Sequence, residues 1–240
     1  MTTAQPYLLA PDDTRFPPVE RTQASGLLAI GGDLRPERLR AAYAQGIFPW
    51  YSAGAPLLWW SPDPRCVFDT ASTRPHRRFA RTLRALPWTL SVDRAFDQVI
   101  AACAAPRAGQ RGTWITPAMR RAYVHLHQLG HAHSFEVWDD AQLVGGLYGV
   151  ASGGMFSGES MFSARSGGSK VALYAACRAL AAWSMPLLDA QVANAHTLAL
   201  GAIEMPRADF IHALQGLASV PSPVDWDAAL PLRHAAALVA

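Results

Sequence analysis

The chain has 240 residues, of which 50% are hydrophobic and 16% charged, so it is long enough and apolar enough to bury a sizeable core. Its longest apolar stretch, around residues 171–188, is interrupted by Arg178, and its N-terminus lacks the pattern of a signal peptide, which argues against membrane spanning and export. The net charge is only +3, and three scattered cysteines argue against a disulfide framework. We therefore expect a globular cytoplasmic protein.

The first quarter of the chain is predicted to contain one helix between irregular segments. Residues 1–33 carry four prolines and the turn-prone segment GLLAIGGDL. The segment RPERLRAAYAQG, residues 35–46, fits a helix with Pro36 at its first position and Gly46 just after its end. Residues 47–65 mix prolines and a glycine with three tryptophans and a tyrosine, which predicts an ordered loop and a short strand.

The remainder reads as alternating helices and strands. Helices are predicted at residues 76–86 and 116–130. The segments HSFEVW, QLVGGLYGVA and GMFSGESMFS then predict an antiparallel meander. An alanine-rich helix at 169–183, a short strand at 186–192, a helix at 207–215 and a proline-containing tail follow. This order indicates an α+β fold with an antiparallel-rich sheet.

Several common chemistries lack their motifs. The chain has neither a P-loop nor a dinucleotide-binding glycine motif. Ser160 is not a nucleophile in a G-x-S-x-G turn, because Phe162 replaces the second glycine. His127 and His131 are four residues apart, but Gly130 should end their helix and no carboxylate accompanies them, so we expect no metal site.

Three polar residues stand out as candidates for catalysis. Glu159 is the only carboxylate in residues 146–163, a segment rich in glycine, serine and apolar side chains. Asp189 and Gln191 lie in the strand LLDAQ, where alternation places both on one side. A buried aspartate must be hydrogen-bonded. Spacing alone leaves a structural hydrogen bond between the two and a catalytic role equally open.

Basic and aromatic residues indicate contact with RNA. On the helix at 76–86, arginines share one face, and tryptophans suited to base stacking occur in FPWY and GTWI. The residues are Arg77, Arg78, Arg81, Arg84, Trp50 and Trp114. A solvated helix face and core packing are the alternative interpretations.

The motifs together resemble those of the leucyl/phenylalanyl-tRNA–protein transferase family. The resemblance is carried, in order, by GLLAIGGDL, GIFPWY, WWSPDPR, TWIT, AYVHLHQLGHAHSFEVW, LVGGLYGV, GESMFS, LDAQ and NAHTLALGAIEMPRADF, which span residues 26–210. Two departures are glycines before Ser169 and Lys170, where the family more often has alanine, and Ala190, where cysteine is frequent.

The resemblance implies transfer of leucine or phenylalanine from its tRNA to an N-terminal arginine or lysine of a protein, which marks that protein for N-end-rule degradation. It also implies a small N-terminal α/β domain with a tryptophan-rich loop, residues 1–65. An acyltransferase domain similar to the GNAT fold would follow, residues 66–240. Because an aminoacyl ester is already activated, no cofactor and no metal are expected.

The resemblance also implies roles for individual residues. Asp189 and Gln191 are expected to orient and deprotonate the attacking amine, and Glu159 to bind the cationic acceptor. The other roles are an apolar pocket for the transferred side chain, formed by Leu147, Phe156 and Met161, and tRNA binding by Trp50, Trp114, Arg77, Arg78, Arg81 and Arg84. Whether Asp189 is a general base or an orienting group stays open.

Two rival functions remain. A CoA-dependent N-acetyltransferase of the GNAT type would use a pyrophosphate loop that Arg165 and Gly168 fit but Lys170 does not. An RNA-binding module without catalysis would make Asp189 structural.

Overall fold

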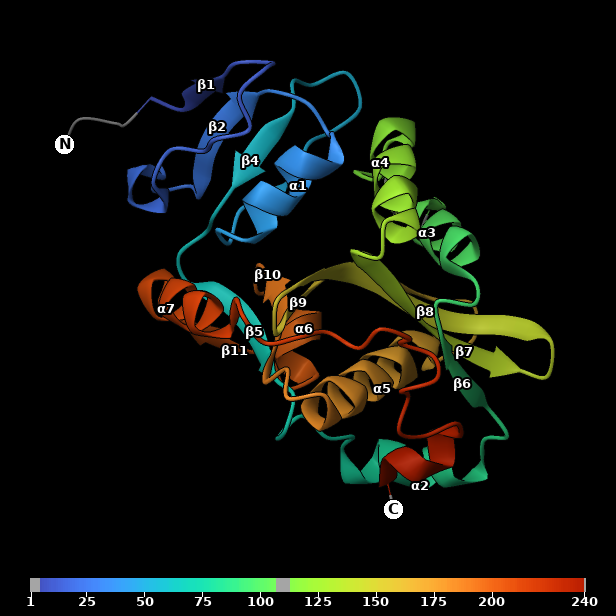
Figure 1. Ribbon diagram of the computed structural model, residues 1–240. Coiled ribbons are helices and arrows are strands. Elements are labelled where there is room, and N and C mark those ends of the chain that lie inside the picture. Colours follow the sequence, from blue (N-terminus) through green and yellow to red (C-terminus); the bar gives the residue numbers. More distant parts are fainter. Residues whose placement is uncertain (1–4, 107–112, 240) are drawn as a thin grey trace.

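The computed structural model describes residues 5–106 and 113–239, and these form a mixed α/β molecule with seven α-helices and two mixed β-sheets (Figure 1). The smaller sheet has the strand order β1-β2-β4-β3. Its strands are β1 (Tyr7–Leu9), β2 (Leu27–Gly31), β3 (Phe48–Pro49) and β4 (Leu58–Trp60), and helix α1 (Pro36–Tyr43) joins β2 to β3. Only the β1–β2 pair is parallel.

The larger sheet has seven strands in the order β11-β5-β10-β9-β8-β7-β6. They are β5 (Arg65–Asp69), β6 (Thr89–Val92), β7 (Ala132–Asp139), β8 (Gln142–Ser152), β9 (Met155–Ser163), β10 (Leu187–Gln191) and β11 (Ile203–Met205). Strands β9 and β10 are parallel, and all other neighbours are antiparallel.

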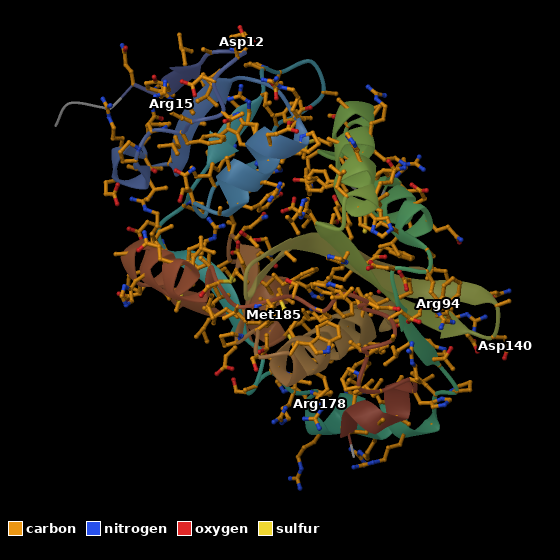
Figure 2. The ribbon with its side chains drawn as sticks, in the orientation of Figure 1. Asp12, Arg15, Arg94, Asp140, Arg178 and Met185 are labelled. Carbon is orange, nitrogen blue, oxygen red and sulfur yellow. The ribbon has the colours of Figure 1, made fainter. Side chains whose placement is uncertain are left out.

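Helices cover both faces of the larger sheet. Helices α3 (Phe96–Ala104) and α4 (Pro117–Gln128) lie with α1 on one face, where Tyr148 of β8 joins their apolar core. Helix α5 (Gly168–Ala182) covers the other face, together with α2 (Arg77–Ala85). Met185 lies deep in this second core (Figure 2). Helices α6 (Ala195–Ala199) and α7 (Arg207–Leu217) follow β10 and β11.

Two β-bulges occur next to each other in β9 and β10. In β9, Gly158 and Ser160 pair with consecutive residues of β8, so Glu159 between them is the extra residue. In β10, Ala190 is the extra residue opposite β5. The parallel ladder between the two strands ends at Asp189 and Ser157. The candidate site begins where this ladder stops.

The predicted helices at residues 76–86, 116–130, 169–183 and 207–215, the meander and the strand at 186–192 are confirmed within one to three residues at their ends. The prediction for residues 1–33 was incomplete, because β1 and β2 lie there. Helices α3 and α6 and strands β5, β6 and β11 were not predicted. Most of these elements are short, so their periodicity is weak, and their pairing partners lie far away in sequence.

Candidate functional site

A small open cavity of about 180 Å³ lies at the end of β10, between β3 and the segment that precedes α4. It is lined by Phe48, Pro49, Trp50, Trp114, Glu159, Ala190, Gln191 and Val192. The cavity thus combines two tryptophans with two of the three polar candidates from the sequence. Asp189 precedes Ala190 in β10 but does not line the cavity.

Glu159 is buried and accepts hydrogen bonds from three directions. Tyr43, the last residue of α1, donates its hydroxyl to Oε1 at 2.8 Å, and Tyr123 of α4 donates to Oε2 at 3.1 Å. The amide Nε2 of Gln191 donates to Oε1 at 2.6 Å. The two tyrosine hydroxyls are also hydrogen-bonded to each other. Glu159 is therefore held from α1, α4 and β10 at once.

Burial dominates the electrostatics of this group. It raises the pKa of Glu159 to about 7, although the hydrogen bonds from Tyr43, Tyr123 and Gln191 act to lower it. Burial, followed by the charge of Glu159, raises the pKa of both tyrosines well above its usual value of 10. The tyrosines are therefore neutral donors at physiological pH, and Glu159 lies close to the middle of its titration.

Asp189 is fully buried and forms a bidentate ion pair with Arg65 of β5. Arg65 Nε and Nη2 lie 2.8 and 2.6 Å from its two oxygens. Ser157 Oγ donates to Oδ2 at 3.2 Å, and the backbone N–H of Gln191 donates to Oδ1 at 2.9 Å. Arg65 also donates to the carbonyl oxygen of Gly46, and its guanidinium lies over aromatic rings, those of Phe48 and Phe210. Asp189 thus has four donors for its two oxygens.

Gln191 connects Asp189 to Glu159. Its backbone N–H binds Asp189 while its side-chain amide binds Glu159. Its φ of 64° is unusual for a residue other than glycine. The bulge at Ala190 and the hydrogen bond to Asp189 hold this conformation, which keeps the Gln191 side chain in the cavity wall.

Two tryptophans line the cavity. Trp50 follows β3 and is 46% exposed. Trp60 of β4 donates its indole N–H to the carbonyl oxygen of Trp50, which fixes the backbone at that point. Trp114 is half-buried and lies in the segment before α4, where Thr116 caps the helix. Both rings are available to a planar ligand group.

The residues expected to form the apolar pocket lie apart from this cavity. Leu147 and Phe156 are buried in the core that α5 covers, where Phe156 contacts Trp226. Met161 packs against the same core and lines a second cavity of about 520 Å³ with Phe162, Ser163, Ser169 and His196. None of the three lines the cavity that contains Glu159. Their role in holding the transferred side chain stays a prediction.

The four arginines predicted to bind tRNA project from α2. Arg77, Arg78, Arg81 and Arg84 are exposed, while Leu83 on the opposite side is buried. Helix α2 lies on the opposite side of the larger sheet from α1 and α4 (Figure 1). The arginines are therefore not part of the cavity and form a separate basic surface.

Sequence reasoning missed three residues of this site. Tyr43 lies in the predicted helix RPERLRAAYAQG, Tyr123 in the motif AYVHLHQLGHAHSFEVW and Arg65 at the end of WWSPDPR, and the sequence suggested no role for any of them. Arg65 offered a usable signal, because an arginine that leads directly into the apolar strand residues 66–68 requires a buried anion. The tyrosines offered none, since both helices bury tyrosine equally well without a carboxylate.

The part of the chain that the structure describes contains no group of three or more potential metal ligands. Over the same residues, no helix is long and apolar enough to cross a membrane. All three cysteines are buried.

A buried carboxylate with a shifted pKa, at the wall of a cavity with convergent polar groups, defines an enzyme site on a mixed α/β fold. Comparison with known proteins gives the family. Residues 67–215 match the model of the leucyl/phenylalanyl-tRNA protein transferase family, and residues 32–63 match the model of its N-terminal domain. The chain belongs to this family.

Curated relatives agree over nearly the whole length. The leucyl/phenylalanyl-tRNA–protein transferase of Xanthomonas euvesicatoria pv. vesicatoria (strain 85-10) is 61% identical over 217 residues, which are 89% of this chain and 87% of the relative. That of Xanthomonas campestris pv. campestris (strain B100) is 55% identical, covering 99% and 98% of the two chains. That of Xylella fastidiosa (strain M23) is 56% identical, covering 89% and 90%.

Proposed function

We propose that this protein transfers leucine or phenylalanine from aminoacyl-tRNA to the N-terminal arginine or lysine of acceptor proteins, and so marks them for N-end-rule degradation. Family membership supports the reaction. The observation that carries it to this chain is the cavity in which Glu159 and Gln191 face two tryptophans. It offers a carboxylate for a cation and aromatic planes for a terminal base in one place.

The reaction needs little from the protein beyond positioning. The ester between the amino acid and the ribose 3′ oxygen is already activated, so the acceptor amine attacks it directly. The new C–N bond forms, the C–O bond breaks, and the ribose oxygen takes up a proton. The protein must orient the amine, accept its hydrogen bond and stabilise the oxyanion.

Gln191 is the residue we assign to the amine. The side-chain Nε2 of Gln191 donates to Glu159. The side-chain amide oxygen of Gln191 is therefore the atom that can accept a hydrogen bond from the attacking amine. Asp189 acts behind it as a positioning residue. Its two oxygens are taken by Arg65, Ser157 and the Gln191 N–H, so it has no free lone pair directed at a substrate. This supports the orienting role for Asp189 over that of a general base.

Glu159 is assigned to the positively charged acceptor side chain. It lies in the cavity wall and its partners are neutral, so no cation of the protein competes with the acceptor for the ionised carboxylate. In such a buried setting a cation gains more from a carboxylate than it would in water.

The tRNA would use both surfaces. Trp50 and Trp114 are assigned to the terminal aminoacyl-adenosine, and the exposed arginines of α2 to phosphates of the acceptor stem. The leucyl or phenylalanyl side chain would then enter the apolar layer behind β9, where Leu147, Phe156 and Met161 lie. Such a pocket selects modestly by size.

The larger sheet supports a GNAT-like architecture for residues 66–240, since it has one parallel strand pair inside an antiparallel sheet and bulges where that pair ends. We keep the smaller sheet, within residues 1–65, as the proposed N-terminal domain. The apolar core runs across this boundary, because residues of α1, α3 and α4 share one cluster. A cytoplasmic location stays part of the proposal.

The acetyltransferase rival is weakened by Arg165. A pyrophosphate-binding loop needs this side chain free, whereas here it is hydrogen-bonded to Asp139 and Gln142. Calorimetric titration with CoA tests this directly, and binding would favour the rival. Loss of transfer with retained tRNA binding in Gln191→Ala would argue against a purely RNA-binding module.

The deciding experiment is transfer of labelled leucine from charged tRNA to two peptides that differ only in an N-terminal arginine or alanine. We expect transfer to the arginine peptide alone. Glu159→Gln should raise the KM for the acceptor more than it lowers kcat, because it removes binding to the cation. If neither peptide is labelled while charged tRNA still binds, the proposed reaction is wrong for this chain.

A further inference from the structure

Glu159 is a buried carboxylate without a cationic partner. It accepts hydrogen bonds from Tyr43, Tyr123 and Gln191, and across residues 5–106 and 113–239 it forms no ion pair. The arginine at the site, Arg65, is committed to Asp189. An ionised carboxylate in such a position carries a large desolvation cost, which a proton removes.

The hydrogen bonds around Glu159 also call for one more proton than the ionised form provides. Three contacts join Glu159, Tyr43 and Tyr123 in a closed triangle. Two tyrosine protons can fill only two of these contacts, and the third would set two lone pairs against each other. A protonated Glu159 supplies the third proton, and each oxygen group then donates once around the triangle.

Burial is the largest effect on Glu159 and favours its neutral form, while the hydrogen bonds from Tyr43, Tyr123 and Gln191 favour the ionised form. The facing titratable or polar groups are Tyr43 from α1, Tyr123 from α4, Tyr148 from β8, and Asp189 and Gln191 from β10. The negative charge of Asp189 opposes ionisation, and none of these five groups is positively charged. The residues that line the cavity beside Glu159, among them Trp50, Trp114 and Gln191, are all uncharged.

We propose that Glu159 holds a proton in the free enzyme and releases it to solvent when the cationic side chain of the acceptor N-terminus enters the cavity. This inference rests on the proposed function and deepens it. The exchange is balanced: a neutral acid and a guanidinium give a carboxylate–guanidinium pair and one free proton. The incoming charge replaces the missing counter-ion, and Tyr43, Tyr123 and Gln191 then all donate to the ionised carboxylate.

The exchange makes Glu159 a determinant of acceptor specificity. A neutral side chain of similar size leaves the proton in place and gains only an ordinary hydrogen bond. A permanent cation gains the buried ion pair. The affinity for such a cation should fall about tenfold for each pH unit below the titration of Glu159, because the proton must then be expelled, and should be level above it.

The test counts protons released on binding. The ligand is the des-amino analogue of arginyl-alanine amide, which keeps the guanidinium but has no group that titrates between pH 5 and 10. Titration calorimetry in buffers of low and high ionisation enthalpy, at pH 6 and at pH 8.5, gives the number of protons. We expect release of about one proton at pH 6 and about none at pH 8.5 in the wild type.

Two variants identify the source. Glu159→Gln should abolish proton release at pH 6 and weaken binding. Glu136→Gln is the matched control, since Glu136 of β7 is a second buried glutamate whose pKa burial raises to about 7, and it does not line the cavity. Its variant should release protons as the wild type does.

Three results would overturn the proposal: no proton release at pH 6 in the wild type, unchanged release in Glu159→Gln, or no binding of the des-amino ligand at either pH. The labelled-leucine assay separates these from failure of the proposed function. Arginine-dependent transfer without proton release would leave the function standing and remove this inference alone.

Discussion

Arg65 shows how much one buried charge depends on its partner. Its side chain is 1% exposed, and it joins Asp189 of β10 to the carbonyl oxygen of Gly46, just beyond α1, between the rings of Phe48 and Phe210. Such a pair adds little net stability over an apolar replacement, but removing one partner leaves the other charge unpaired. The ion pair is therefore better understood as a device that fixes Asp189, and through it Gln191.

This predicts a large effect from Arg65→Ala. The free energy of unfolding should fall by about 3 to 5 kcal/mol, because Asp189 keeps its burial and loses its cation. Urea denaturation measures the loss. Arg81→Ala, at an exposed position of α2, is the control and should change stability by no more than about 0.5 kcal/mol. Equal effects of the two substitutions would mean that the pair does not hold the site together.

Glu136 predicts a pH dependence of stability with a definite sign. Burial raises its pKa from 4.5 to about 7, so the folded protein binds more protons than the unfolded chain between these values. The stability that the protonated Glu136 side chain gives to the folded protein is therefore fully present below about pH 4.5, and it is lost as the pH rises to about 7. The free energy of unfolding of Glu136→Gln, relative to that of the wild type, should increase across this pH window by on the order of 2 to 3 kcal/mol. Urea unfolding at pH 4.5 and 7.5 checks it, and an equal difference at both pH values would refute it.

At the scale of elements, periodicity identified the long helices and the meander, while the geometry of the site escaped it. The alternation in LLDAQ correctly predicted a strand, but it placed Asp189 and Gln191 on one side as an ordinary pair. The bulge at Ala190 instead links them through the Gln191 backbone. Bulges depend on the partner strand, and neither β5 nor the end of the β9–β10 ladder was visible in the sequence.

The contact between β8 and α5 gives a prediction at this scale. A Cβ on Gly145 would lie 2.3 Å from the backbone of Gly168 at the start of α5. Gly145→Ala should therefore destabilise the fold by about 1 to 3 kcal/mol, because backbone must move. Gly216→Ala in α7 is the matched control, where a Cβ meets open space and a helical alanine should stabilise by about 0.5 to 1 kcal/mol. Thermal unfolding of both variants decides, and the expectation fails if they shift the midpoint in the same direction.

Across the whole molecule, the site lies where the smaller sheet and α1 meet the larger sheet. Tyr43 and Trp50 come from the first quarter of the chain, Trp114 and Tyr123 from the middle, and Gln191 from the last quarter. Composition and local pattern carry no information on which distant segments meet, so the sequence could name Glu159 and Gln191 but not the tyrosines that bind Glu159. The resemblance to the family suggested the roles of Glu159 and Gln191, and the structure identified the residues that they contact.

The arginines of α2 form a basic surface away from the cavity, so their part in tRNA binding can be tested separately through the dependence of binding on salt. If the arginines of α2 contact phosphates, Arg81→Ala should weaken binding and reduce the slope of log K against log salt by about 1. Arg15→Ala is the control and should leave the slope unchanged, since Arg15 is exposed at the far end of the molecule beside the smaller sheet (Figure 2). Filter binding at several salt concentrations measures both. Identical slopes for wild type and Arg81→Ala would remove α2 from the tRNA surface.

The hydrogen bonds of the site also bear on how the protein matures. Tyr43 and Glu159 are 116 residues apart in sequence, Arg65 and Asp189 are 124 apart, and Tyr43 and Tyr123 are 80 apart. Contacts with such long loops form late, since their closure entropy must be overcome before they gain anything. A growing chain would hold its helices well before it holds this cavity. Transfer activity should therefore return later than helical structure during refolding.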